Sequence, residues 1–175
     1  KAGMLLAVAL TLGYAVNVSV PASMAASLPT IPGRDVIIIG GHDQKVHWRL
    51  TVPSDVSSTV EGPYPFLVML HALGMSGWDV NGYSELVTAV AKRGFVVVTC
   101  FDYPAVQPQD TPVWVQDTIS GARTQLSIPG VDFDRTGVMG HSMGGGATIH
   151  AIAASGPEYG IKAGVGIHPW MFEAP

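Results

Sequence analysis

A serine flanked by glycines carries the clearest chemical signal in this sequence. Gly140-His141-Ser142-Met143-Gly144 follows a run of apolar residues, and small apolar residues continue after it as far as Ala154. A Gly-x-Ser-x-Gly pentapeptide at a strand-to-helix turn exposes a serine hydroxyl, and the glycines are needed there because side chains would collide with neighbouring backbone. Ser142 is therefore predicted to be a nucleophile.

Two backbone N–H groups are predicted to stabilise the oxyanion that forms when such a serine attacks a carbonyl group. One belongs to Met143, directly after the nucleophile and at a helix start, where the helix dipole favours negative charge. The other belongs to Leu73, in the turn that follows an apolar strand and begins at His71. His71 is expected to brace this turn through a backbone hydrogen bond and to line the substrate site.

A serine hydroxyl also needs a base that takes its proton, commonly a histidine oriented by an acidic side chain. We expect the acid and the histidine to lie beyond residue 175, so that residues 1–175 alone have weak or no turnover. Within the sequence, His168 is the candidate base and Glu173 the candidate acid. His141 lies inside the turn itself, so its ring does not fold back readily on the Ser142 hydroxyl.

Composition narrows the class of protein. The chain has 175 residues, of which 47% are hydrophobic and 13% charged, enough for one buried core and hardly enough for two. A net charge of −4 without a lysine or arginine cluster argues against nucleic acid as a partner. The single cysteine excludes a disulfide within the chain, and the histidines lack metal-ligand spacing. We expect neither a metal nor a cofactor, and the oligomeric state is left open.

The first residues resemble a secretory signal. A positive start precedes an apolar run from Met4 to Val16, and the small residues Ser23 and Ala25 fit a cleavage site. Residues 1–25 are therefore predicted to be a signal peptide, and the protein is expected to be secreted or periplasmic without a stable membrane span. A buried helix or an uncleaved anchor is the alternative.

Later segments alternate between strand-like and helix-like patterns. Strands are predicted at 36–39, 46–52, 66–70, 95–101, 134–139 and 161–167, and helices at 84–92, 113–126 and 143–154. The first helix is expected to turn four residues inward, Leu86, Val87, Val90 and Ala91. Such alternation predicts an α/β fold with a mainly parallel sheet and helices on both faces. His71, Ser142 and His168 each follow a strand, so they should share the edge where ligands bind.

Three segments carry a resemblance to a known superfamily. They are Val138 to Gly146, Ala91 to Val98, and the pair Pro169-Trp170. Over about residues 35 to 170, the chain resembles the α/β-hydrolases and, within them, the secreted polyesterase, lipase and cutinase-like enzymes, the PET hydrolases included. The resemblance implies that residues 26–175 form the N-terminal part of an α/β-hydrolase domain, incomplete at its C-terminus. In this superfamily the triad order is serine, acid and then histidine, which implies an acid and a histidine after later strands.

That resemblance implies a serine esterase that cleaves a small-molecule, lipid or polymer ester through an acyl-enzyme on Ser142. It also implies that Trp170 lines the acyl-binding cleft, where His168 is expected to contact substrate as well. Leu73 stands where polyester-degrading relatives carry an aromatic residue, and His168 where they carry a small hydroxyl residue, so polyester is not specifically indicated. The alternatives are a catalytically incomplete binding protein of the same fold and an esterase that resembles chlorophyllase or platelet-activating-factor acetylhydrolase.

Overall fold

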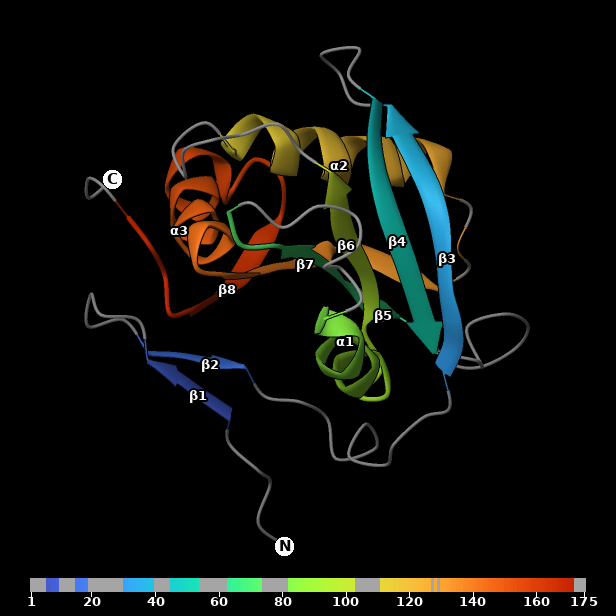
Figure 1. Ribbon diagram of the computed structural model, residues 1–175, viewed down its shortest axis with the longest axis horizontal. Helices are drawn as coiled ribbons and strands as arrows, with labels where there is room; N and C mark the ends of the chain where they lie inside the picture. Colours follow the sequence, from blue (N-terminus) through green and yellow to red (C-terminus); the bar gives the residue numbers. More distant parts are fainter. Residues whose placement is uncertain are drawn as a thin grey trace, which may run out of the picture.

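Strand β5 (Tyr64–Leu70) lies at the centre of the fold, and every one of its residues is buried. A strand without a solvent-facing side must have other layers on both faces. The computed structural model, which describes residues 6–9, 15–18, 30–39, 45–53, 63–73, 82–102, 111–126, 128 and 130–171, shows how this is achieved. A six-stranded sheet has the order β3-β4-β6-β5-β7-β8, with β5 inside it (Figure 1).

The elements follow the predicted alternation. The other strands of this sheet are β3 (Thr30–Ile39), β4 (Lys45–Pro53), β6 (Val96–Asp102), β7 (Val131–His141) and β8 (Ile161–Ile167), and the helices are α1 (Ser84–Ala91), α2 (Pro112–Gln125) and α3 (Met143–Ser155). Strands β6, β5, β7 and β8 are parallel, whereas β4 runs antiparallel to both β3 and β6. The prediction of a mainly parallel sheet is therefore confirmed.

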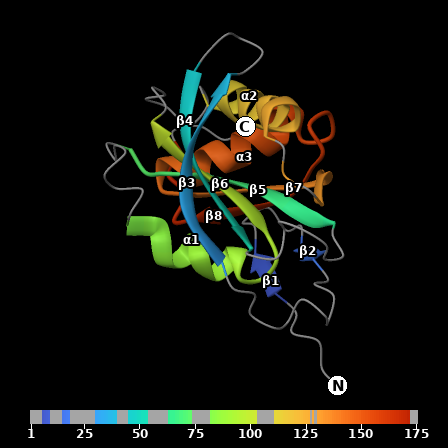
Figure 2. The same ribbon diagram turned by 90° about the vertical axis from the view of Figure 1, so that its right-hand side faces the viewer.

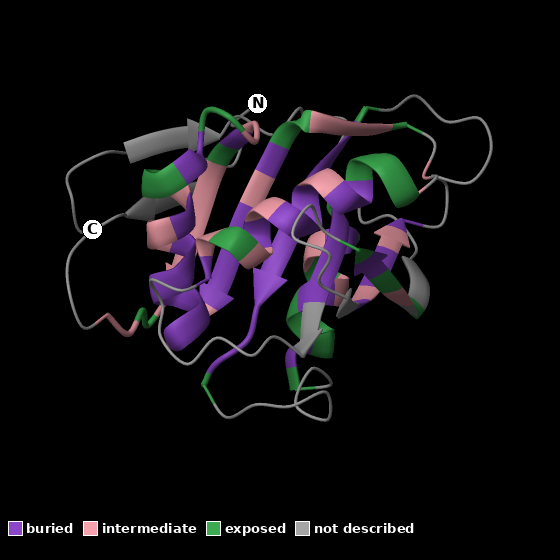
Figure 3. Cartoon of the chain, turned by 90° about the horizontal axis from the view of Figure 1, so that it is seen from above, coloured by how far each residue is buried: buried purple, intermediate pink, exposed green. Residues whose placement is uncertain are grey.

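Helices cover both faces of the sheet, with α1 on one side and α2 and α3 on the other (Figure 2). Each face has its own hydrophobic core. The smaller core, under α1, contains Leu67, Met69, Tyr83, Val87, Ala91, Val97 and Met139. The larger core includes Trp48, Phe66, Val68, Leu70, Val98, Val115, Ile119, Val138 and Met143. Figure 3 shows the buried residues concentrated along the central strands between these helices.

Helix α1 buries residues at a spacing of four, namely Tyr83, Val87 and Ala91. This spacing keeps side chains on one helix face. The prediction that Leu86 points inward was wrong, because Leu86 is 37% exposed. One step along the helix rotates a side chain by about 100°, which turns Leu86 away from the face of Val87. Gly94 follows the helix; it has a φ of 88° and its N–H donates to the Ala91 carbonyl.

Two strands begin earlier than their apolar runs suggest. Strand β7 starts at Val131, which pairs with Tyr64, and the register shifts before Phe66 pairs with Thr136. Strand β3 starts at Thr30, with a similar shift between Ile31 and Arg34. Both predicted starts were too late. The first residues of these strands pair irregularly and include polar residues and a proline, so they do not form the apolar run from which a strand is predicted. Proline is tolerated in β3 because this strand lies at the edge of the sheet.

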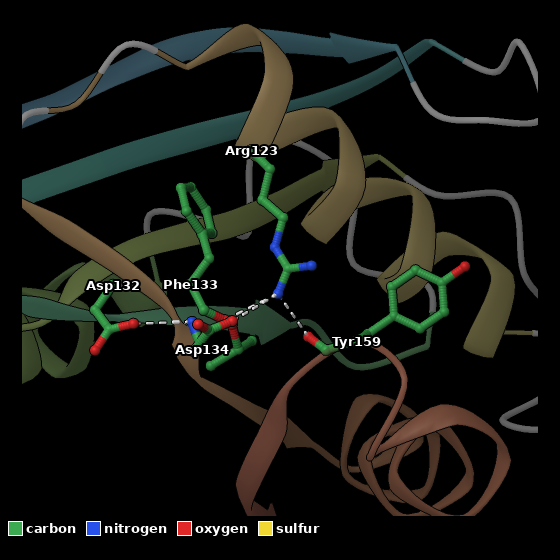
Figure 4. A network of polar contacts seen from close by, with 6 residues as sticks. Arg123, Asp132, Phe133, Asp134 and Tyr159 are labelled. Carbon is green, nitrogen blue, oxygen red and sulfur yellow. Dashed lines mark hydrogen bonds and ion pairs between the residues drawn. The ribbon is translucent and has the colours of Figure 1, made fainter.

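Arg123 links helix α2 to strand β7 and to the turn after α3, on the side of the larger core (Figure 4). Its Nη2 donates to the carbonyl oxygens of Phe133, in β7, and Tyr159, in the turn after α3, at 3.1 and 3.3 Å. The same nitrogen lies 3.9 Å from a carboxylate oxygen of Asp134. One guanidinium group therefore joins α2 to both elements that flank α3.

Near the N-terminus, strands β1 (Leu6–Ala9) and β2 (Ala15–Val18) form a separate antiparallel pair. They are the described part of the predicted signal peptide. The expected cleavage site after Ala25 lies outside the described residues, so the signal assignment stays a prediction. Among the described ranges, no helix combines the length and the apolar character that crossing a membrane requires.

Candidate active site

Ser142 occupies a sharp turn of its own between β7, which ends at His141, and α3, which begins at Met143. Its backbone has φ 54° and ψ −114°, a conformation that residues with side chains rarely adopt and that costs about 1–3 kcal/mol. Among the non-glycine residues that the structure describes, only His168 also has a positive φ, of 44°. Strain of this kind persists only where surrounding contacts hold the backbone in place.

Backbone hydrogen bonds hold the strained turn on both sides. The N–H of Ser142 donates to the carbonyl of Ile167, the last residue of β8, at 2.9 Å. The Ser142 carbonyl accepts from Gly146 within α3 at 3.1 Å and from Trp170 at 2.8 Å. The last residue of β8 and the segment that follows it thus each bond to the serine backbone, and together they hold the turn in place.

The glycines of the pentapeptide are explained by close backbone contacts. A methyl group on Gly140 would collide with the carbonyl of Gly144. A methyl group on Gly144 would lie 2.5 Å from the Leu70 carbonyl oxygen and 2.6 Å from that of His71. The start of α3 therefore packs directly on the end of β5, as a strand-turn-helix that presents a nucleophile requires.

The carboxyl ends of β5 and β7 meet at a topological switch point. From β5 the chain passes through α1 to β6 on one side, whereas from β7 it passes through α3 to β8 on the other. Open α/β sheets bind ligands in the crevice at such a point. Leu70 pairs with Gly140, so the turn that contains His71 and Leu73 starts beside Ser142, as the sequence predicted.

The two predicted oxyanion donors belong to the segments that follow these two strands. Met143 is the first residue of α3, so its N–H has no carbonyl partner within the helix. Leu73 lies in the turn after β5, with 49% of its residue exposed. Nδ1 of the buried His71 is 2.7 Å from the carbonyl oxygen of Ala72, which confirms the predicted backbone bond. Because that carbonyl shares a planar trans peptide with the Leu73 N–H, the His71 ring also fixes the direction of this donor.

The remaining predicted residues lie near the turn in different ways. Trp170 is half-buried against the larger core and bonds to Ser142 through its backbone. His168 follows β8 and is exposed. Within the described ranges, no histidine hydrogen-bonds to the Ser142 hydroxyl. Glu173, the candidate acid, lies outside the described residues.

Sequence reasoning missed Tyr83. Its buried hydroxyl accepts a hydrogen bond from the Ala72 N–H at 3.3 Å and lies 2.9 Å from Nδ1 of His141. The sequence did contain a signal for Tyr83. It precedes Val87 and Ala91 at the same spacing of four, which places it on the buried face of α1. A tyrosine on that inner face must find a polar partner for its hydroxyl.

Comparison with known proteins places this site in a family. A family model described as PET hydrolase-like matches residues 80–174, which is more than half of the chain and includes the serine turn. The chain belongs to the PET hydrolase-like family. The α/β-hydrolase resemblance and the predicted fold class are confirmed with it.

Individual relatives agree with this placement of the PET hydrolase-like chain. A bis(hydroxyethyl) terephthalate hydrolase of Streptomyces coelicolor is 32% identical over 119 residues, which cover 67% of this chain and 36% of the relative. Cutinase 1 of Thermobifida cellulosilytica is 33% identical over 86 residues, which cover 46% of this chain and 31% of the cutinase. The chain thus spans about a third of the length of these curated relatives.

A solved structure shares the fold. A Klebsiella pneumoniae protein described as a dienelactone hydrolase superposes with a TM-score of 0.62 and 16% identity. The match covers 80% of this chain and 60% of that protein. At this identity the likeness concerns the arrangement of strands and helices, and it supports an α/β-hydrolase fold.

Proposed function

We propose that this PET hydrolase-like chain carries the nucleophile and the oxyanion donors of a serine esterase. The observation that carries the proposal is the backbone of Ser142, held at φ 54° and ψ −114° directly before the free N–H groups that begin α3. Strained backbone that the surroundings hold in place is typical of functional sites, and this one lies at the switch point of the sheet.

In this proposal, Oγ of Ser142 attacks the carbonyl carbon of a carboxylic ester. Its proton passes to a base, and the negative charge moves to the carbonyl oxygen, where the N–H groups of Met143 and Leu73 stabilise it. Collapse of this intermediate expels the alcohol, which takes the proton from the base, and leaves an acyl-enzyme. Water, deprotonated by the same base, then releases the carboxylic acid and restores Ser142.

The base and its carboxylate partner are assigned to residues outside the described ranges. His168 is the described histidine at the carboxyl end of β8, and its exposure fits a contact with substrate better than general-base catalysis. His168→Ala tests this division of roles. We expect a change of a few-fold in KM, whereas a loss on the order of 10³-fold or more in kcat would make His168 the base.

Carboxylic esters are the proposed substrate class. The relatives are named as a bis(hydroxyethyl) terephthalate hydrolase and as cutinases, and these names denote ester hydrolysis. Small-molecule, lipid and polymer esters all present the carbonyl group that the site requires. Trp170, fixed beside Ser142 by its backbone bond, is proposed to contact the acyl group.

The proposed location is outside the cytoplasm. The apolar run from Met4 to Val16 and the small residues Ser23 and Ala25 support a signal peptide that is removed after Ala25. N-terminal sequencing of the protein from its native host is expected to begin at Ala26. Recovery of residues 1–25 on the mature protein would overturn this assignment.

Hydrolysis of p-nitrophenyl butyrate by the protein expressed from its complete gene tests the proposed function. Ser142→Ala should reduce kcat to background, a fall on the order of 10⁶-fold. Ser84→Ala is the matched control, because Ser84 is an exposed serine at the start of another helix, and its kcat should equal that of the wild type. A wild type that binds esters without turnover would instead favour the catalytically incomplete binding protein.

A further inference from the structure

The hydroxyl of Tyr83 lies between two loops that the proposed reaction uses. It accepts from the Ala72 N–H at 3.3 Å, in the turn after β5, and lies 2.9 Å from Nδ1 of His141, the last residue of β7 before Ser142. These partners are 11 and 58 residues away along the chain, so the contact depends on the folded structure. We propose that Tyr83 is a positioning residue that locks the Leu73 oxyanion donor to the turn that carries Ser142.

Packing fixes the place of the Tyr83 ring. It belongs to the smaller core with Val87 and Ala91 of α1 and with Met139 of β7. Met139 and His141 are two residues apart on one strand, so their side chains share the face that α1 covers. The Tyr83 and His141 rings meet edge to face, with centroids 5.9 Å apart. A ring held by α1 and by strand β7 gives its hydroxyl a fixed position.

The contacts of Ala72 decide which N–H group is available in this turn. The Tyr83 oxygen accepts the Ala72 proton, and the same hydroxyl lies 2.9 Å from Nδ1 of His141. The N–H and the carbonyl of Ala72 are therefore both bonded, the carbonyl to His71. Ala72 cannot serve as an oxyanion donor, and the next N–H, that of Leu73, is left for the role.

This inference rests on the proposed esterase function, and it predicts a specific kinetic signature. An oxyanion donor strengthens its bond only in the transition state, so its displacement lowers kcat more than it raises KM. Complete loss of such a donor costs about 10²–10³-fold in kcat. Because the donor in Tyr83→Phe is displaced and not removed, we expect a smaller fall in kcat, about ten-fold, with KM within about two-fold of the wild type.

Two measurements on the protein from its complete gene test the proposal. The first is amide hydrogen exchange, which does not depend on activity: in Tyr83→Phe the Ala72 amide should exchange about ten-fold faster, whereas the buried Ala147 amide of α3 should not change. The second is a double-mutant cycle in which Tyr83→Phe and His141→Leu are measured singly and together. If the two side chains act as one unit, the double variant loses no more kcat than the worse single variant. Tyr159→Phe, on the opposite side of the sheet, is the control tyrosine and should keep the wild-type kcat.

The outcomes separate this inference from the proposed function. Unchanged exchange at Ala72, or additive losses of kcat in the cycle, would overturn the role of Tyr83. So would a lower melting temperature with an unaltered kcat, because the hydroxyl would then serve stability alone. Failure of the esterase proposal looks different: wild-type protein without turnover, or Ser142→Ala that keeps full turnover, removes the reaction, whatever the exchange at Ala72 shows.

Discussion

The backbone N–H of Trp170 donates to the carbonyl oxygen of Ser142 across 2.8 Å. The two residues come from segments that leave neighbouring parallel strands, β7 and β8. The bond therefore ties the residue proposed to contact the acyl group to the residue proposed to attack it. Because the bond uses only backbone atoms, the Trp170 side chain can be changed without removing the contact.

Replacement of the Trp170 side chain should alter substrate preference more than turnover. In Trp170→Ala the backbone donor stays, but the aromatic surface is lost, and an aromatic contact contributes about 1 kcal/mol beyond area burial. We expect KM for p-nitrophenyl benzoate to rise about five-fold. The KM for p-nitrophenyl acetate should change little. Equal changes for both esters would contradict a place for Trp170 at the acyl group.

Proline at position 73 tests the second oxyanion donor directly, because it removes the N–H. Leu73→Pro should lower kcat about 100-fold or more. Leu73→Ala is the matched control, since the exposed side chain contributes little and the N–H is kept. Equal kcat values for the proline and alanine variants would show that the Leu73 N–H does not bind the oxyanion.

Gly144→Ala should destabilise the protein, because it disturbs the packing of α3 on β5. The new methyl group would lie 2.5 Å from the Leu70 carbonyl oxygen, and both groups are backbone-anchored, so the start of α3 must move away from β5. We expect the free energy of unfolding to fall by about 2–3 kcal/mol, measured by urea denaturation. Gly82→Ala serves as the control, because a methyl group there has no atom within 4 Å. A stable Gly144→Ala protein would contradict the close approach of the two backbones.

The Gln125 side chain should stabilise the end of the edge strand β3. Its side-chain amide accepts from the Ile39 N–H at 3.0 Å and donates to the Ile39 carbonyl, as a neighbouring strand would. Gln125→Ala should lower the free energy of unfolding by about 1 kcal/mol and speed exchange of the Ile39 amide. Gln116→Ala, on the same helix, should do neither. Unchanged Ile39 exchange in the Gln125 variant would contradict this role.

The fold was largely predictable because its signals are local. Helix α2 was predicted at 113–126, and Val115, Ile119 and Ala122, spaced three and four residues apart, are fully buried on it. Strand β8 was predicted with its observed bounds of Ile161–Ile167. Such periodicity depends only on neighbours along the chain. Leu86 was misplaced because its apolar side chain alone does not say which face of α1 meets the sheet.

The candidate site was predictable only where a motif is contiguous. The turn around Ser142 is five residues long, and its glycines have steric causes that a sequence pattern records. The bridge from Ala72 through Tyr83 to His141 has no such pattern, since it depends on the pairing of β5 with β7 and on the docking of α1. The same limit applies to the two backbone bonds that join Ser142 to Ile167 at the end of β8 and to Trp170 after it.

Covalent labelling of the protein expressed from its complete gene with a fluorophosphonate probe tests the central claim most directly. The probe reacts with activated serine hydroxyl groups, so intact mass should show one adduct per chain, and peptide mapping should locate it on Ser142. Ser142→Ala should remain unlabelled under the same conditions. Undiminished labelling of Ser142→Ala, or an adduct on another residue of the wild type, would contradict the assignment of Ser142 as the nucleophile.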